Sequence, residues 1–264
     1  MPLAISALLG VIEGLTEFLP VSSTFHLLAA AKVLGLPDTA YQQAFEVIIQ
    51  GGAILAVLFL YTKAILTDRR LLLRLILSCI PTVVVGFALY KVIKGVFFVT
   101  PWLTLGTFLV VGLIFLWVER RVQRGELRLT RDLHTLSYQD ALLIGLAQAL
   151  AVVPGVSRAG SVIVAMMHLG YTREESARYT FMLSLPTILA ASLYDAYKSR
   201  AALLASRTEG LSLLVGLGVA FVVALAVSTW FVEYLKKHDL KIFAYYRFLL
   251  GALYALFLIT VARS

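Results

Sequence analysis

Residues 13–26 read EGLTEFLPVSSTFH and place two carboxylates, several hydroxyls and one imidazole inside an otherwise apolar stretch. The flanking segments, Ala4–Ile12 and Leu27–Ala31, are apolar enough for a lipid bilayer. Each ionisable group at membrane depth costs at least a few kcal/mol unless it is paired, hydrated or bound to a ligand. Pro20 also interrupts any helix in the middle of this stretch. The segment therefore predicts a functional site at a break between two short helices.

The composition indicates an integral membrane protein. The chain has 264 residues, of which 60% are hydrophobic and 14% charged, and its mean hydropathy is +0.90. Soluble domains carry about 25% charged residues. The net charge of +8 does not indicate a nucleic-acid partner. Its basic residues stand in short loops between apolar runs, which is the pattern that sets membrane topology.

The apolar runs fall into two length classes. A helix needs about 20 residues to cross the hydrocarbon core. Four runs are too short or too interrupted for this, and they pair around Pro20 and around Pro154-Gly155; they are Ala4–Phe18, Thr24–Leu34, Ala141–Val153 and Ser161–Leu169. Six runs qualify as full crossings, namely Ala44–Tyr61, Leu71–Tyr90, Trp102–Val118, Tyr179–Tyr197, Leu211–Val232 and Ala244–Val261. We therefore predict an all-α protein with six transmembrane helices and two re-entrant helical hairpins.

The order short, short, long, long, long occurs twice, and matching residues recur at an offset of 134. Pro20 matches Pro154 and Ser23 matches Ser157. We therefore predict a single membrane domain, 1–264, with one repeat over about 1–118 and a second over about 138–264. Because three crossings per repeat is an odd number, the second repeat must be inverted.

The distribution of Lys and Arg predicts the orientation. One set of loops carries about twice as many of these residues as the other, and the poorer set includes Lys94 and Arg263. The richer side is expected to be cytoplasmic. Both termini and the mouth of the first hairpin would then face outward, toward the periplasm or exterior.

Glu13 and Glu17 are four residues apart, so they share one face of a short helix. Two carboxylates there repel each other unless a cation, an arginine or a shared proton intervenes. Mg²⁺ and Ca²⁺ prefer carboxylate oxygens and can bridge to phosphates. The pair is thus a candidate metal site, and the alternative is a solvated helix end.

Hydroxyls follow the break at Pro20. Ser23 is a candidate nucleophile, and Ser22 and Thr24 are candidates for substrate contacts; alternatively these hydroxyls cap the next helix. His26 stands three residues beyond Ser23 and is a candidate nucleophile, general base or general acid. The sequence does not choose between these roles.

The second break reads PGVSRAG from Pro154. Arg158 and the backbone N–H groups of a helix beginning there are suited to hold a phosphate, with Gly155 and Ser157 as further candidate contacts. The alternative is that Arg158 only neutralises a glutamate. Glu46 and Gln50 could line the same cavity or bind a neighbouring helix. Tyr246-Arg247 is expected to be an anchor at the membrane interface.

Five segments resemble the bacterial undecaprenyl pyrophosphate phosphatases of the bacitracin-resistance type. These segments are EGLTEFLPVSSTFH, PGVSRAG, FEVIIQ at 45–50, SLYDAYKS at 192–199 and FAYYRF at 243–248. The resemblance implies a plasma-membrane (inner-membrane) phosphatase that removes the terminal phosphate from undecaprenyl pyrophosphate. It also implies divalent-metal dependence and functional roles for Glu13, Glu17, Ser23, His26 and Arg158.

Two residues depart from the pattern of that family. Phe25 stands where a glycine is usual, and Ala159 stands where a serine is usual. Neither departure deletes a candidate catalytic group. The alternative function is a transporter or flippase of a polyprenyl phosphate lipid, because inverted repeats with broken helices are typical of transporters. Membrane lipids are expected partners in either case, and a homodimer is possible.

Overall fold

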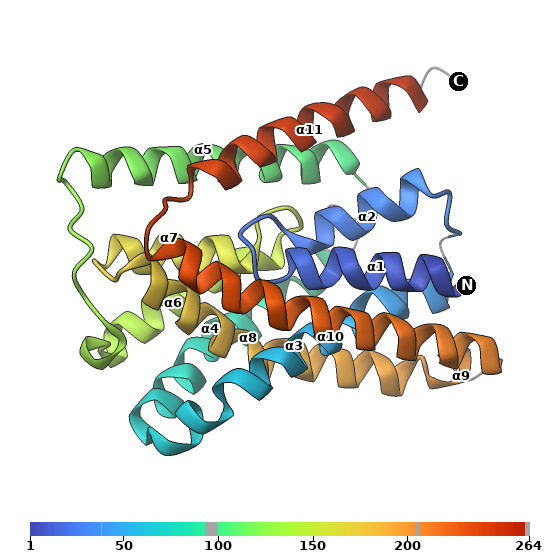
Figure 1. Cartoon of the computed structure of the whole chain (residues 1–264), viewed down its shortest axis with the longest axis horizontal. Helices are drawn as coiled ribbons and strands as arrows, with labels where there is room; N and C mark the ends of the chain where they lie inside the picture. The colour runs from blue at the N-terminus through green and yellow to red at the C-terminus, as the bar shows by residue number, and fades with distance from the viewer. Residues whose placement is uncertain (38, 93–99, 204–205, 262–264) are drawn as a thin grey trace. The chain divides into compact units, whose positions relative to one another are not determined.

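The computed structural model describes residues 1–37, 39–92, 100–203 and 206–261, without the side chains of 87, 90–92, 201–202 and 207. Lys94 and Arg263, which entered the charge comparison, lie outside these residues. In the described part of the chain the regular structure is helical (Figure 1). The α-helices are α1 (Leu3–Thr16), α2 (Ser23–Val33), α3 (Ala40–Thr67), α4 (Arg69–Val92), α5 (Pro101–Gln123), α6 (Tyr138–Ala149), α7 (Arg158–His168), α8 (Arg173–Lys198), α9 (Arg200–Leu203), α10 (Arg207–Leu235) and α11 (Lys241–Val261). The described residues also form the 3₁₀ turns η2 (Leu133–Thr135) and η3 (Leu150–Val152).

Long helices form at all six positions where full crossings are predicted. Among the described residues, four of them are long and apolar enough to cross a membrane: α3, α5, α10 and α11. The other two, α4 and α8, have 24 and 26 residues. Helix α8 begins six residues earlier than the predicted Tyr179, because Arg178 pairs with Glu174 one turn away and stabilises a polar first turn.

The predicted helix breaks at Pro20 and Pro154 are confirmed. Helix α1 has 14 residues and α2 has 11, separated by a turn that contains Pro20. Helix α6 has 12 residues and passes through η3 to the turn at Pro154-Gly155, after which α7 continues for 11 residues. None of these short helices reaches the length of about 20 residues that a crossing needs.

The described chain forms two compact units. The first unit comprises Met1–Leu19, His26–Leu72 and Phe181–Phe231, and the second comprises Pro20–Phe25, Leu73–Thr180 and Val232–Ser264. In the first unit, α1 packs against α10 through small residues. A Cβ added to Gly10 would lie 2.6 Å from the carbonyl oxygen of Gly216, and one added to Gly14 would lie 2.8 Å from that of Ala220. The backbones are therefore nearly in contact.

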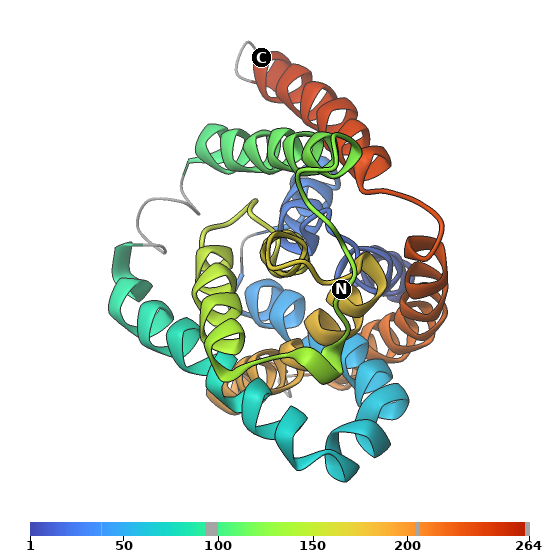
Figure 2. The same cartoon turned by 90° about the vertical axis from the view of Figure 1, so that its left-hand side faces the viewer.

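In the second unit, α5 and α11 lie side by side, as both Figure 1 and Figure 2 show. The ring of Phe248 in α11 lies against Gly112 in α5, where a Cβ would be 3.0 Å from it. Helices α4 and α6 meet just as closely. A Cβ on Gly145 would lie 2.4 Å from the carbonyl oxygen of Ser78, and the Ser78 hydroxyl donates to the Ala141 carbonyl at 2.6 Å. The two short helices α6 and α7 also pack on each other.

Candidate functional site

Glu13 and Glu17 lie at the end of α1, in the first unit. Glu13 is fully buried and Glu17 is 7% exposed. Glu17 is the C-cap of α1, and its N–H donates to the Glu13 carbonyl at 2.9 Å, so the two residues are one helical turn apart. Their burial contradicts the alternative of a solvated helix end. Two carboxylates so close together need compensation by a cation, a donor or a proton.

The turn after α1 presents its hydroxyls at the start of α2. Ser22 has a left-handed backbone, with φ of 68°, and Ser23 is the first residue of α2. Both serines are buried, at 5% and 8% exposure, while Thr24 is half-buried. His26 is half-buried and lies on the first turn of α2, as predicted. Ser23 therefore stands at the positive end of a helix dipole.

The turn of the second hairpin contains a glycine that no other residue can replace. Gly155 has φ of 91°, and an added Cβ would lie 2.3 Å from Oγ1 of Thr107 and 2.5 Å from the Thr104 carbonyl. The Thr107 hydroxyl donates to the Pro154 carbonyl at 2.6 Å. Gly155 is thus required by the turn itself, apart from any contact with substrate.

Ser157 and Arg158 begin the last helix of this hairpin. Ser157 is left-handed, with φ of 70°, and its hydroxyl accepts a hydrogen bond from the Gly160 N–H at 3.2 Å. It is therefore the N-cap of α7, a role that satisfies one of the free N–H groups of the helix. Arg158 is the first residue of α7 and is half-buried.

The two turns correspond to each other with a shift of one residue from the sequence comparison. The offset of 134 pairs Ser157 with Ser23, but the left-handed serines are Ser22 and Ser157, and the helices that follow begin at Ser23 and Arg158. The backbone offset at the turns is therefore 135. Under this pairing, Ser23 and Arg158 occupy the same position in their two hairpins, the first residue of the second helix.

Arg247 is not the interfacial anchor that the sequence predicts. Its side chain is fully buried, and its guanidinium donates from Nε to the Pro20 carbonyl at 2.9 Å. Nη1 donates to the carbonyls of Phe108 at 2.9 Å and Gly155 at 3.1 Å. This arginine thus binds the turns of both hairpins. Its neighbour Tyr246 remains 41% exposed.

Glu46 and Gln50 are half-buried on one face of α3, in the first unit. The side-chain amide of Gln42 donates to Oε1 of Glu46 at 2.9 Å, and that of Gln50 donates to the Glu46 carbonyl at 3.3 Å. These bonds run along the helix, so they do not require a substrate. A substrate contact at either residue stays a prediction.

Phe25 and Ala159, the two departures from the family pattern, are both buried. The Phe25 ring stacks on Phe108, with centroids 4.0 Å apart and an angle of 10° between the planes, and meets Tyr254 edge-on at 5.1 Å. Phe25 therefore packs against aromatic residues of α5 and α11. The bulky ring is accommodated within the packing of the second unit.

A polar network holds the outer ends of the second hairpin. Arg131 donates to Oδ2 of Asp140 at 2.7 Å and to the carbonyl of Leu169 at 2.9 Å, and the Tyr171 hydroxyl donates to the same carboxylate at 2.8 Å. Burial raises the pKa of Asp140, but the hydrogen bonds from Tyr171 and Arg131 outweigh it, so that the pKa lies below its usual value. Because Asp140 also closes the capping box of α6 with Ser137, the network joins the beginning of α6 to the residue after α7.

A metal ion fits the donor chemistry of α1 but needs further ligands. Glu13 and Glu17 offer hard carboxylate oxygens in a buried setting, as Mg²⁺ and Ca²⁺ prefer. Among the described residues, no group of three or more His, Cys, Asp or Glu side chains is placed to hold a metal. Substrate oxygens and water would have to complete the coordination.

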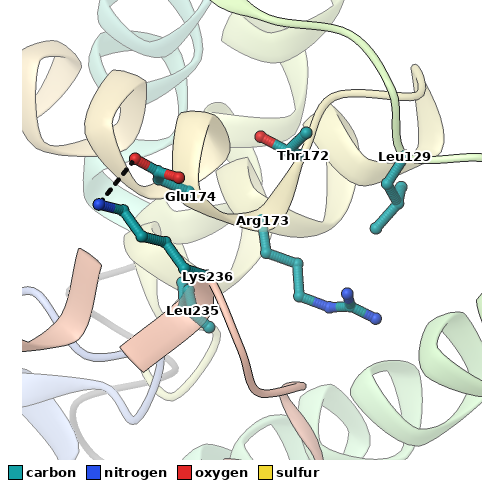
Figure 3. Close-up of a pocket in the computed structure, with 6 residues that line it drawn as sticks. All are labelled: Leu129, Thr172, Arg173, Glu174, Leu235 and Lys236. Atoms are coloured by element: carbon teal, nitrogen blue, oxygen red, sulfur yellow. Dashed lines mark ion pairs between the residues drawn. The ribbon is translucent and has the colours of Figure 1, made fainter. Parts of the chain in front are cut away.

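A pocket of about 250 Å³ lies elsewhere in the second unit (Figure 3). It is lined by Leu129, Thr172, Arg173, Glu174, Leu235 and Lys236. Its charges are already compensated within the protein. Arg173 binds both carboxylate oxygens of the buried Glu119, and Lys236 lies 3.8 Å from Glu174 and 2.6 Å from Glu233. These ion pairs tie α5, α8 and α10 together.

This chain is similar to known proteins along nearly its whole length. The model of the family described as "Bacitracin resistance protein BacA" matches residues 6–253. A protein of Sulfurihydrogenibium sp. (strain YO3AOP1) named undecaprenyl-diphosphatase is 41% identical over 251 residues, which cover 95% of this chain and 97% of the relative. A protein of the same name from Aquifex aeolicus (strain VF5) is 39% identical over 252 residues, covering 96% and 97%. A protein of Rhodospirillum rubrum named undecaprenyl-diphosphatase 2 is 40% identical over 257 residues, covering 93% and 91%.

Proposed function

The chain belongs to the family of the bacitracin resistance protein BacA, and from this premise we propose that it hydrolyses undecaprenyl pyrophosphate to undecaprenyl phosphate and inorganic phosphate. The reaction recycles the lipid carrier for cell-wall synthesis. The long apolar helices place the protein in the membrane as a multi-pass protein, where the isoprenoid tail of the substrate can remain in lipid. The observation that carries the proposal is the pair of hairpin turns, each of which presents a polar residue at a helix N-terminus.

Arg158 is proposed to bind the terminal phosphate. It begins α7, an 11-residue helix whose first N–H groups point out of the helix end. A guanidinium and a helix N-terminus both favour a phosphate dianion, and the planar fork can bind two of its oxygens at once. Arg158 would thereby hold the phosphorus for attack and stabilise the charge that develops on its oxygens.

Ser23 is the proposed nucleophile, with His26 as its base. The two residues are three positions apart on α2, so their side chains lie on the same face of the helix. His26 would take the proton of the Ser23 hydroxyl as Oγ bonds to the terminal phosphorus. The bond from that phosphorus to the bridging oxygen breaks, and undecaprenyl phosphate leaves. His26 passes its proton to the departing undecaprenyl phosphate or to solvent, and the neutral imidazole then takes a proton from a water molecule that attacks the phosphoserine. The bond from phosphorus to Ser23 Oγ breaks, Oγ takes the proton back from His26, and inorganic phosphate is released.

Glu13 and Glu17 are the proposed ligands of a divalent cation, Mg²⁺ or Ca²⁺. When bound, such an ion supplies positive charge that neutralises the pyrophosphate oxygens. Without it, the two buried carboxylates would repel the anionic substrate, so the pair itself favours a metal-dependent reaction.

The membrane topology of the chain can be inferred from the lengths of its helices. We infer six crossings by α3, α4, α5, α8, α10 and α11, with the pairs α1–α2 and α6–α7 as re-entrant hairpins of two inverted repeats. The helix lengths support this arrangement, since the four paired helices have 11 to 14 residues and are too short to cross, whereas the six proposed crossing helices have 21 residues or more. The charge distribution supports an inner membrane location in which both termini and the active site face the periplasm or exterior.

The test is phosphate release from undecaprenyl pyrophosphate by the purified protein in detergent, with and without EDTA. We expect release that EDTA abolishes and that added Mg²⁺ or Ca²⁺ restores. Ser23→Ala should lose nearly all activity. Ser6→Ala is the matched control, because Ser6 is also buried and its hydroxyl donates to the Pro2 carbonyl within the first turn of α1. Absence of phosphate release from the parent protein with either metal would refute the proposed function.

A further inference from the structure

Arg247 is a buried arginine that the proposed reaction does not use. Its side chain is 0% exposed, although it stands in an otherwise apolar helix, α11. Its partners in the described part of the chain are carbonyl oxygens and aromatic rings rather than a carboxylate. The guanidinium carbon lies 4.6 Å from the ring centre of Phe108 and 5.3 Å from that of Phe115. A charged group is costly in buried, apolar surroundings, so the presence of Arg247 there indicates a specific role.

The carbonyls that Arg247 binds are equivalent positions in the two hairpins. Nε binds the carbonyl of Pro20, two residues before the left-handed Ser22. Nη1 binds the carbonyl of Gly155, two residues before the left-handed Ser157. The offset between the bound carbonyls is 135, the same as that between the two serines. One guanidinium therefore holds the same point of both turns.

The geometry of the guanidinium makes this a rigid connection. Its nitrogens lie in one plane at fixed angles, so two hydrogen bonds from Nε and Nη1 fix a direction as well as a distance. The Phe108 carbonyl, which shares Nη1, ties the same group to α5. The Phe108 ring is in turn stacked on Phe25, in the first turn of α2. The arginine, the two turns and the beginning of α2 thus form one packed group.

We propose that Arg247 is a positioning residue that fixes the turns of both hairpins relative to each other, and with them Ser23 and Arg158. Each of these two residues begins a helix three residues after a carbonyl that Arg247 binds. Their separation is therefore set through one side chain. The consequence for catalysis rests on the proposed function, because a nucleophile displaced by about 1 Å from the phosphorus can lose about 100-fold in rate.

The first test does not depend on activity. Hydrogen exchange is measured on the purified, folded protein for the amides of 21–25 and 156–160. In Arg247→Lys, which keeps the charge but lacks the fork, we expect exchange in both segments to rise about tenfold or more, while 131–141 is unchanged. Arg131→Lys is the matched control. Arg131 also binds two carbonyls, of Thr135 and Leu169, so its replacement should loosen 131–141 and leave both turns as they were.

A uniform rise in exchange over the second unit, or a rise at only one turn, would overturn the proposal. If Arg247→Lys does not fold, Phe108→Leu gives a second test. It removes the ring beneath the guanidinium and leaves the arginine in place, so it should raise exchange at both turns in the same pattern. Unchanged exchange at the turns in folded Phe108→Leu would count equally against the proposal.

The second test uses phosphate release. Arg247→Lys should lower kcat about tenfold or more and change KM less than about threefold, because Arg158 still binds the substrate. In the background of Ser23→Ala the same replacement should have no further effect, since a positioning residue cannot act on an absent nucleophile. Multiplicative losses would show that Arg247 does not act through Ser23. If the parent protein is inactive, the proposed function fails, while the exchange experiment still decides the role of Arg247.

Discussion

Replacing Gly145 by alanine tests the close approach of α6 to α4, which supports the second hairpin. The added Cβ would lie 2.4 Å from the Ser78 carbonyl oxygen and 2.9 Å from the Ser78 Cα. Ordinary contact needs about 3.4 Å or more, so the helices must separate by roughly 1 Å. The atoms in the way belong to the backbone of α4 and cannot rotate aside.

The expected cost follows from three contributions. Forcing an extra methyl group into packed structure costs about 1–3 kcal/mol. A separation of roughly 1 Å also stretches the 2.6 Å bond from the Ser78 hydroxyl to the Ala141 carbonyl beyond hydrogen-bond distance, which costs about 0.5–1.5 kcal/mol. Alanine has a higher helix propensity than glycine, which stabilises the folded protein by about 1 kcal/mol and offsets part of this cost. The net destabilisation of Gly145→Ala is therefore about 2 kcal/mol.

The measurement is the free energy of unfolding in detergent, by denaturant titration monitored through circular dichroism. Gly106→Ala in α5 is the control, because an added Cβ there meets no described atom within 4 Å. The same substitution should therefore raise stability at Gly106 by about 0.5–1 kcal/mol. Equal effects at Gly145 and Gly106, or a stabilised Gly145→Ala, would refute the reasoning.

Three further predictions concern metal, pH and orientation. Glu13→Gln keeps the shape of the side chain but removes its charge, so the Mg²⁺ concentration for half-maximal phosphate release should rise about tenfold or more; an unchanged metal titration would exclude Glu13 as a ligand. Because the pKa of Asp140 is lowered in the folded protein, its contribution to stability is present above the usual pKa of about 3.9 and is lost as pH falls through the folded value. The midpoint of thermal unfolding should accordingly fall less below pH 4 in Asp140→Asn than in the parent, and parallel curves would contradict this. In a background without the native cysteine, Thr39→Cys should react with an impermeant maleimide on intact cells and Gln123→Cys should not, and the reverse pattern would invert the proposed orientation.

The helix breaks could be predicted because their causes are local. Pro20 and Pro154 remove a backbone donor and clash with the preceding turn wherever they stand inside a helix. The burial of Glu13 and Glu17 was favoured over a solvated helix end for a similar reason, since apolar residues precede Glu13 and follow Glu17. Sequence alone places such features because each depends on residues within a few positions.

The role of Arg247 could not be predicted in the same way. Its three acceptors are 92, 139 and 227 residues away in the chain, and each is a backbone carbonyl that carries no signal of residue type. The correspondence of Ser22 with Ser157 was missed for a related reason. The match of residue types at an offset of 134 pairs Ser23 with Ser157. The positive φ angle that defines the turn, which Ser22 and Ser157 share, is a property of the folded chain.

The packing of α1 against α10 has a consequence for biosynthesis. Gly10 reaches its partner Gly216 only after about 200 further residues have been made, and the Ser212 hydroxyl donates to the Met1 carbonyl across a similar span. At a synthesis rate of about 5–20 residues per second, the helix that carries both glutamates waits roughly 10–40 s for the surface that will bury it. During that interval the 14-residue helix α1, which is too short to cross a membrane, can pack on α3 but not yet on α10. The surface of α1 that packs on α10 is therefore covered last, so the environment of the two glutamates is completed only when most of the chain has been made.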